Sequence, residues 1–565
     1  MAAIVALGIA WGLMMHAPGW AQSSYYAQVR ALADGRAEID RWHWETQDKA
    51  WIDRHYYSVK APGLAAYSLP AYLALDAVGG KAIARDAADA AARSDNPRWT
   101  LAGNGVMAPY ETFGYSSDRA ERVWIEIADG TPVVWWLTLF GAVIPAVLLL
   151  LLVRWVADRV DPGYGTAAAI TLGLGTIVLT FGSEYLAHVI AAMLGFVAFA
   201  ILFRERAGPG NLALVGAAGL VAGLAVTFEY PLVLAGTVIF VYALTRPERR
   251  VARGAAYAAG AVLGAIPALA FNQWAFGDPL QFAYGDAIAR AGFSGHAELG
   301  LNDDGLFGIT FPSPAKATDL LVSSRGLLTL TPVIAMAVVG IWLLGKRQQW
   351  RTEARVLGAV TAAYFIYNSA YWLPMGGGTP GPRFLIPALP FVAIGFATAY
   401  RRLPALTLGL AIPSAMFMFV GMITFPLLGE NGTGLWVSRW WAGHLEHTVL
   451  TTLGVGNAWL AAAPVLLAIA AAIVLTALAT PRGRIGEVRA AFGALLGWML
   501  IAIVGPTVAG DPITPIDGGP QTVQLIAFAV LVSAATLLTL SYRERRSAPS
   551  GSLPGPEPAL RGRIS

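Results

Sequence analysis

Residues 131–153 read TPVVWWLTLFGAVIPAVLLLLLV and contain no charged side chain. Coiled as an α-helix, a run of this length can cross a hydrocarbon core of roughly 30 Å, for which about 20 residues suffice. Similar apolar runs recur along most of the chain. We therefore predict an all-α polytopic membrane protein with about 14 transmembrane helices, over residues 2–18, 131–153, 164–182, 185–203, 210–228, 230–245, 254–272, 326–344, 356–373, 384–400, 404–427, 456–479, 488–509 and 521–541.

The composition excludes several classes of protein. Of the 565 residues, 56% are hydrophobic and 13% are charged, and the mean hydropathy is +0.56, which rules out a soluble globular protein. The chain has no cysteine, which excludes disulfides, thiolate nucleophiles, iron–sulfur clusters and cysteine zinc sites. The net charge of +4 is explained by basic residues in short loops, and we expect no nucleic-acid partner.

The placement of lysine and arginine predicts the topology. A further apolar stretch, Leu64 to Val78, is only about 15 residues long and is interrupted by Pro70. If it does not cross the membrane, all the basic connectors fall on one side, which the positive-inside rule assigns to the cytoplasm. We therefore predict an interfacial or re-entrant helix at 64–78 and both termini in the cytoplasm. The basic connectors contain Arg154, Arg159, Arg204, Arg206, Arg246, Arg249, Arg250, Arg253, Lys346, Arg347, Arg351, Arg355, Arg401, Arg402, Arg482, Arg484, Arg489, Arg543, Arg545 and Arg546.

This topology predicts one transmembrane domain, residues 1–545, in a multi-pass protein of the inner (plasma) membrane. Residues 546–565 are rich in Ser, Pro, Gly and Arg, and we expect them to form a disordered cytoplasmic tail. An alternative for residues 1–21 is a signal peptide, although no positive charge precedes the apolar run. The predicted external regions are two large loops, 19–130 and 273–325, and a moderate one, 428–455.

The first external loop is the part of the chain densest in Asp, Glu, His, Lys, Trp and Tyr. Asp48 and Asp40 offer a carboxylate base for chemistry at a membrane surface. His55 and Lys60 offer proton donors or anion ligands, and the ring of Tyr57, like those of its aromatic neighbours, suits a sugar. The alternative interpretation is an interfacial aromatic belt with solvated charges.

Two further polar clusters join spans on the external side. Glu184 and His188 are four residues apart, so in a continuous helix they would share a face. They could line a substrate cavity, supply two ligands to a metal, or form a self-contained pair that closes a helix end. Glu229, in Glu-Tyr-Pro, reads as a solvated loop residue.

A third cluster combines glycine with arginine. Residues 375–384 read MGGGTPGPRF and place Arg383 at the start of a predicted span. Exposed backbone N–H groups beside a helix start, together with a guanidinium, form a plausible cradle for phosphate. Arg325, in Ser-Ser-Arg-Gly at the end of the second external loop, has the same geometry. The alternative for both arginines is a tight turn whose arginine reaches lipid headgroups.

The order of these motifs resembles the GT-C class of membrane glycosyltransferases, particularly bacterial relatives of protein O-mannosyltransferases and of the lipid A aminoarabinose transferase. The likeness extends over roughly residues 1–400, with the matching topology. It rests on Lys60-Ala-Pro-Gly, similar to the Lys-Pro-Pro signature of the class, and on Gly308-Ile-Thr-Phe-Pro, Ser324-Arg325-Gly-Leu-Leu and Gly381-Pro-Arg383-Phe-Leu-Ile-Pro.

The chain departs from this class at one place. Many members carry an acidic residue a few positions after the first span, where it serves as base or metal ligand. Residues 19–25 of this chain read GWAQSSY and contain no acid. If the chain is active, the catalytic carboxylate must come from later in the loop.

The resemblance implies an inverting glycosyltransferase whose donor is a polyprenyl-phosphate sugar and whose acceptor is a glycan, lipid or protein, with membrane lipids as further partners. Asp48 is then the predicted base, with Asp40 as the alternative, and Lys60 and Arg383 are the predicted phosphate ligands. Glu184 and His188 would line the acceptor side. A divalent metal is possible. Other hypotheses are a transporter or lipid-linked sugar flippase, an oligosaccharide polymerase and an inactive scaffold; a transporter would be expected to carry ionisable groups in mid-span.

Overall fold

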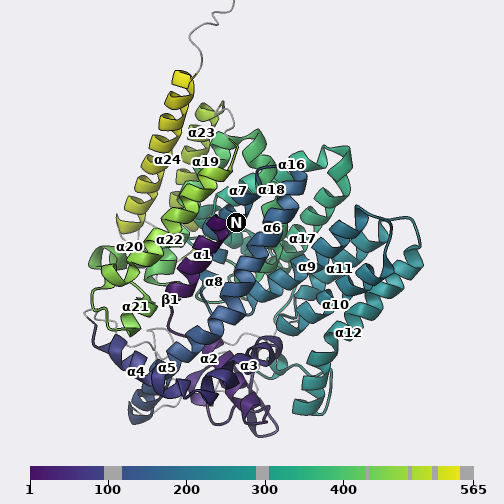
Figure 1. Ribbon diagram of the computed structural model, residues 1–565, viewed down its shortest axis with the longest axis vertical. Helices are drawn as coiled ribbons and strands as arrows, with labels where there is room; N and C mark the ends of the chain where they lie inside the picture. Colours follow the sequence, from purple (N-terminus) through teal and green to yellow (C-terminus); the bar gives the residue numbers. More distant parts are fainter. Residues whose placement is uncertain (95–116, 288–304, 428–431, 482–485, 512–519, 548–565) are drawn as a thin grey trace, which may run out of the picture.

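The computed structural model describes residues 1–94, 117–287, 305–427, 432–481, 486–511 and 520–547. These residues are almost entirely helical, apart from two sheets of two short strands each. Figure 1 shows the long helices side by side, with a group of shorter elements across one end. Most of the predicted tail, residues 546–565, lies outside the described residues.

The predicted all-α polytopic architecture is confirmed. Among the described residues, eight helices are long and apolar enough to cross a membrane, or nine if a helix pair bent by 91° at residues 330–333 counts as one span. That pair consists of α14–α15 (Pro314–Leu330) and α16 (Val333–Gly345). The eight are α5–η3–α6 (Glu121–Val160), α9 (His188–Arg206), α12 (Arg250–Phe276), η6–α18 (Arg383–Arg402), α19 (Pro404–Thr424), α22 (Ala458–Ala479), α23 (Val488–Val508) and α24 (Gln521–Glu544).

The other predicted spans coincide with helices that are shorter, broken or, in the case of α17, less apolar. The first, predicted over residues 2–18, ends at Leu13 because Met14 and Met15 continue as strand β1, which pairs with His447–Thr448 of β4. The remaining ones are α7 (Gly165–Leu174) with α8 (Val178–Phe181), α10 (Leu212–Phe228), α11 (Leu232–Leu244) and α17 (Arg351–Ala370).

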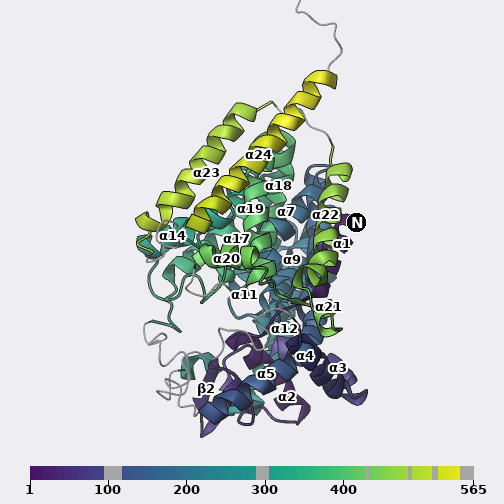
Figure 2. The same cartoon turned by 90° about the vertical axis from the view of Figure 1, so that its left-hand side faces the viewer.

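The first predicted external loop folds into a compact group of elements at one end of the long helices (Figures 1 and 2). The stretch predicted to be interfacial forms a separate helix, α3 (Gly63–Ala77), with Pro70 inside it. The group also contains α2 (Trp20–Ala33), η1 (His43–Glu45), β2 (Lys49–Ile52), β3 (His55–Ser58) and α4 (Gly80–Ala92), and it contacts the start of α5 (Ser117–Thr138). The second and third loops contribute η4 (Ala283–Asp286), α20 (Gly432–Ala442) and α21 (Val449–Thr452).

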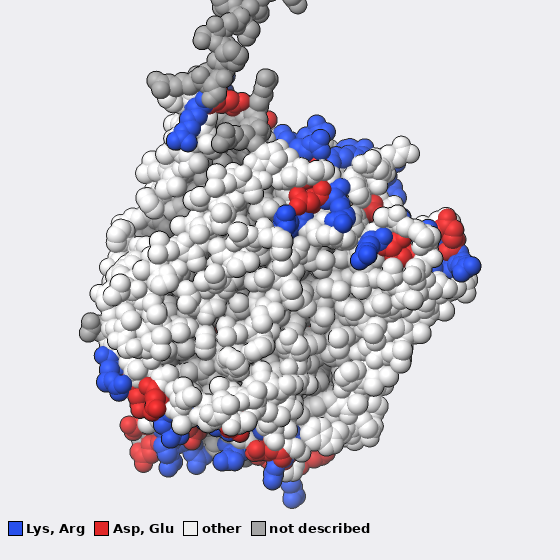
Figure 3. Space-filling model, viewed as in Figure 1, with Lys and Arg blue, Asp and Glu red and all other residues white. Residues whose placement is uncertain are grey.

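At the opposite end, buried ion pairs tie together connectors that the sequence predicts to share one side. The carboxylate of Asp161, fully buried, lies 2.9 Å from an Nη1 of Arg347 and 2.7 Å from an Nη1 of Arg401. The Thr398 hydroxyl donates to its other oxygen at 2.5 Å. Figure 3 shows the resulting distribution, in which charged residues gather at the two ends and the band between them is white. This agrees with a common side for these connectors.

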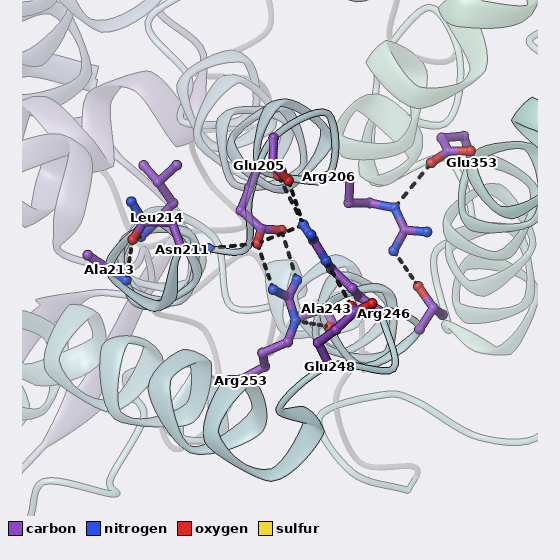
Figure 4. A network of polar contacts seen from close by, with 12 residues as sticks. Glu205, Arg206, Asn211, Ala213, Leu214, Ala243, Arg246, Glu248, Arg253 and Glu353 are labelled. Atoms are coloured by element: carbon purple, nitrogen blue, oxygen red, sulfur yellow. Dashed lines mark hydrogen bonds and ion pairs between the residues drawn. The ribbon is translucent and has the colours of Figure 1, made fainter.

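A second network joins the connectors that flank α9, α11 and α12 (Figure 4). Glu205 has a fully buried carboxylate that binds the guanidinium of Arg253 through both oxygens, at 2.7 and 2.9 Å. It also accepts from the backbone N–H of Asn211 and lies 3.4 Å from Arg246. Four segments of the chain are therefore held by one carboxylate.

We expect the Glu205→Gln variant to be destabilised by about 3 kcal/mol, because the buried Arg253 would lose its counter-charge. Thermal unfolding in detergent measures the change. Glu248→Gln is the matched control, since Glu248 also pairs with Arg246 but has a mostly exposed side chain. Equal effects of the two substitutions would contradict the assignment of Glu205 as the organising charge.

The predicted orientation can be tested by cysteine labelling, because the chain has no native cysteine. A cysteine at Ser94, which follows α4, is expected to react with an impermeant reagent added outside. A cysteine at the exposed Arg402, at the other end of the helices, should react only after the membrane is permeabilised. Labelling of Ser94 from the cytoplasm alone would reverse the topology.

Candidate functional site

The hairpin of β2 and β3 brings Asp48 and Lys60 together. Lys49 pairs with Ser58 in the antiparallel register, so Asp48, one residue before this pair, and Lys60, two residues after it, lie at the same end of the hairpin. The ammonium of Lys60 lies 2.6 Å from the carboxylate of Asp48. The two side chains are mostly buried, with 15% of Lys60 and 14% of Asp48 exposed. The sequence named both residues, and the structure joins them as one ion pair.

Helix α2, which follows the first span, supplies hydrogen-bond donors to three neighbouring segments. The Gln22 amide donates to Glu184 at 2.6 Å while its oxygen caps the helix start. The Ser24 hydroxyl donates to the backbone oxygen of Asp48 at 2.6 Å, and the Tyr25 hydroxyl to Glu229 at 3.5 Å. The segment that lacks an acid therefore contacts three residues that carry carboxylates from elsewhere.

Glu229 lies inside the site. Its carboxylate is 3.2 Å from Nδ1 of His188, and 16% of the Glu229 side chain and 6% of the His188 side chain are exposed. The interpretation of Glu229 as a solvated loop residue is therefore wrong. Glu184 and His188 do not form the self-contained pair that the sequence left open as an alternative, because α9 begins at His188 and the chain turns through the residues before it. A usable signal was present: α9 and α10 have 19 and 17 residues and a short connector, so the start of one lies beside the end of the other.

A glycine allows the first loop to reach this pair. A Cβ at Gly63 would lie 2.5 Å from the backbone oxygen of Thr227, so only glycine fits without a shift. The chain just after Lys60 therefore runs against the last turn of α10, two residues before Glu229. Lys60 is close enough to Glu229 for its positive charge to favour the ionised form of that carboxylate.

The glycine-rich turn carries the second cation. Its glycines adopt left-handed conformations, with φ of 77° at Gly376 and 110° at Gly377. Arg383 begins a 3-10 helix, η6 (Arg383–Ala388), and its charge also acts on Glu229. Its Nε is buried and has no hydrogen-bond partner among the described residues. Arg325 is used differently, because it donates to the backbone oxygen of Gly377 at 2.7 Å and so supports the turn.

Three predicted site residues make their contacts with groups other than Lys60, Arg383 and Glu229. Asp40 and His55 form a separate pair, 2.6 Å apart, on the exposed edge of the hairpin, with side chains 41% and 52% exposed. The Tyr57 hydroxyl donates to the backbone oxygen of Ala275, and its ring packs edge-on against Phe276. Tyr57 therefore attaches the first external loop to the end of α12.

Aromatic side chains of the second loop and α17 flank the site. The hydroxyls of Tyr284 and Tyr371 are hydrogen-bonded to each other. The Tyr371 ring meets the Phe384 ring edge-on, with centroids 5.2 Å apart, and stacks on Tyr367. The charges of Asp48 and Arg383 both act on the Tyr284 hydroxyl. Both large predicted loops thus meet at one place.

Glu184 belongs to a neighbouring buried cluster. His16 lies 2.9 Å from the Ser183 hydroxyl and 3.6 Å from the carboxylate of Glu446. Glu184 bonds to Gln22 through one oxygen, and its other oxygen has no hydrogen-bond partner among the described residues. Burial raises the pKa of Glu184 to about 7, although His16 and Gln22 favour its ionised form.

The main site combines two cations with two carboxylates: Lys60, Arg383, Asp48 and Glu229. Burial raises the pKa of Glu229 to about 7, although Lys60, Arg383 and the Tyr25 hydroxyl favour the ionised form. Such a site can bind an anion and accept a proton near neutral pH. Within the described ranges, no group of three or more His, Asp or Glu residues could hold a metal ion.

A cavity of about 390 Å³ lies elsewhere, lined by Trp155, Arg159, Phe203, Arg204 and Ala207. It is at the C-terminal ends of α6 (Ile144–Val160) and α9, whereas His188 is at the start of α9. It is therefore separate from the cluster of carboxylates.

No protein-family model matches the sequence, and no curated protein matches it. Among solved structures, the chain is similar to ArnT from Cupriavidus metallidurans, whose crystal structure was determined bound to undecaprenyl phosphate. The identity is 13%, the match covers 94% of this chain and 86% of that chain, and the TM-score is 0.47.

We expect Glu184→Gln to stabilise the protein at pH 8 and to change little at pH 5. The raised pKa means that the ionised form is disfavoured in the folded state, so wild-type stability falls as the pH rises from about 4.5 through about 7. The uncharged glutamine removes this loss, worth at most about 3 kcal/mol. Unfolding temperatures in detergent at the two pH values measure it, and a pH-independent difference would contradict burial as the cause.

Proposed function

We propose that this protein is an integral-membrane glycosyltransferase that transfers a sugar from a polyprenyl-phosphate donor to an acceptor at the external face by inverting displacement. The acceptor is a glycan, lipid or protein. A lipid-phosphate donor suits a site at the ends of membrane-capable helices, because the leaving group stays in the bilayer. The donor class comes from the sequence motifs, Lys60-Ala-Pro-Gly and Gly381-Pro-Arg383-Phe.

The observation that carries the proposal is that the segments of Lys60 and Arg383 both pack beside Glu229. Gly63, three residues after Lys60, lies against Thr227, and Phe384, which follows Arg383, meets the ring of His188, which is 3.2 Å from the Glu229 carboxylate. These cations come from segments more than 300 residues apart in the sequence. Inverting transfer needs cations to stabilise the phosphate as its charge develops, and a carboxylate to take the proton of the acceptor hydroxyl. The site holds both kinds of group. Asp48 as the base stays a prediction, and Asp40, which pairs with His55 away from Glu229, is the weaker alternative.

The alternative function, a transporter or lipid-linked sugar flippase, needs a path that opens at both ends. Asp161 with Arg347 and Arg401, and Glu205 with Arg253, tie the connectors at the end opposite the site. This asymmetry favours chemistry at one surface over transport.

The decisive test is transfer by the purified full-length chain in nanodiscs. Radiolabelled undecaprenyl-phosphate sugars of several kinds are incubated with the protein and a membrane extract, and label in the acceptor fraction is measured. Transfer from at least one donor, with release of undecaprenyl phosphate, is expected. Transport of a donor across proteoliposomes without any transfer would favour the flippase.

Arg383→Ala is expected to weaken the binding of undecaprenyl phosphate by roughly 10-fold to 100-fold, because a charge-assisted contact to phosphate contributes about 1.5–3 kcal/mol. Arg36→Ala, the same substitution at an exposed arginine of the first loop, is the matched control. Titration of each variant in nanodiscs gives the dissociation constants. Identical affinities for the two variants would remove Arg383 from the phosphate site.

A further inference from the structure

Asp48 and Glu229 are placed differently with respect to the cations. Asp48 is in direct contact with Lys60 at 2.6 Å. Glu229 instead contacts His188 at 3.2 Å and Tyr25 at 3.5 Å. Lys60 and Arg383 act on it only through their charges, without a direct contact. Protonation of Asp48 would break the contact that fixes Lys60, whereas protonation of Glu229 would leave both cations in place.

The charge balance of the transfer step distinguishes the two carboxylates further. A sugar-phosphate diester carries one negative charge, and the phosphate monoester that leaves gains most of a second, since its second pKa is near 6. In a buried site, the new negative charge on the phosphate is best compensated when a carboxylate near the same cations is neutralised by a proton. Glu229 meets this condition, because the charges of Lys60 and Arg383 both act on it and it can lose its own charge without breaking the ion pair of Lys60 with Asp48.

We propose that Glu229 is the proton acceptor of the transfer reaction and that His188 positions it. The inference rests on the proposed function. The acceptor oxygen forms a bond to the anomeric carbon, the bond from that carbon to the phosphate oxygen breaks, and the phosphate keeps the electron pair. The proton of the acceptor hydroxyl passes to Glu229. Asp48 keeps its contact with Lys60 and so holds that ammonium in position.

Geometry around Glu229 suits this role. The turn that carries it is fixed, because the Tyr364 hydroxyl donates to the Pro231 backbone oxygen at 3.0 Å. A pKa of about 7, raised by burial, makes the carboxylate a base matched to neutral pH. The titratable or charged groups that face it are Tyr25 on α2, Lys60 after β3, His188 on α9, its neighbour Tyr230, Tyr364 and Tyr367 on α17, and Arg383 on η6.

The test compares Glu229→Gln with Asp48→Asn, and uses Glu38→Gln as the control because Glu38 is a loop glutamate paired with Arg36. Glu229→Gln should lower kcat by roughly 10²-fold to 10⁴-fold. Its affinity for undecaprenyl phosphate should be unchanged or higher, because glutamine imitates the protonated acid. This retained binding also shows that the variant is folded. Asp48→Asn should weaken binding, since it releases Lys60.

Proton uptake gives a readout that does not depend on transfer. Undecaprenyl phosphate is titrated calorimetrically at pH 8 in two buffers of different ionisation enthalpy. The wild type should take up more protons than Glu229→Gln, by up to about one per site, because the phosphate charge raises the proton affinity of Glu229. Wild-type kcat should rise with pH through about 7, and this limb should be absent from Glu229→Gln.

The outcomes separate the two proposals. Normal kcat in Glu229→Gln, or equal proton uptake in both proteins, overturns the role of Glu229. Loss of kcat in Asp48→Asn with normal binding, while Glu229→Gln stays active, returns the role to Asp48. A wild type that transfers no sugar yet shows the difference in proton uptake overturns the glycosyltransferase, and supports Glu229 as the proton-accepting group of a phosphate site.

Discussion

An ionised side chain in hydrocarbon is costly unless it has a partner, and this constraint separates the charges of the chain into two groups. At one end, Asp161 and Glu205 are fully buried, and each is held by two arginines. At the other end the compensation is less complete. Arg383 keeps a buried Nε without a hydrogen-bond partner among the described residues, and Glu229 is held by neutral or weakly basic contacts. The first arrangement fixes helix ends, whereas the second leaves charge that an anionic ligand can use.

Helix α2 links the parts of the site, and it occupies the segment where the resembled class carries an acid. Gln22, Ser24 and Tyr25 donate to Glu184, to the backbone of Asp48 and to Glu229. Donors in place of an acid are physically consistent, since a carboxylate there would face other carboxylates and raise their pKa values. The departure from the class is thus accompanied by acids supplied from the β-hairpin and from two helix connections.

Hydropathy predicted where the apolar helices lie, because a run without charge has few other stable forms in a membrane. It did not predict where they end or bend, as at Leu13 or between α15 and α16. Asp48 and Lys60 lie close together in the sequence, within the loop that is densest in charged and aromatic residues. The sequence therefore indicated both residues. Glu229 was misread because a single loop glutamate looks the same whether it is solvated or buried. Its environment depends on the antiparallel packing of α9 and α10, and on Gly63, which admits the first loop. The i, i+4 argument for Glu184 and His188 failed because it assumed a helix that starts only at His188.

The two carboxylates of the site therefore differ in how firmly their charge is held. Asp48 contacts the ammonium of Lys60 at 2.6 Å, so its carboxylate serves to position Lys60. Burial raises the pKa of Glu229, whereas the charges of Lys60 and Arg383 lower it. Because these effects oppose each other, a small change in the charges nearby decides whether Glu229 is protonated. A phosphate that approaches the cations makes such a change. A proton released in a buried site is most readily kept by a group within that site. Glu229 can receive it, because its charge is not fixed by a direct contact with a cation as the charge of Asp48 is.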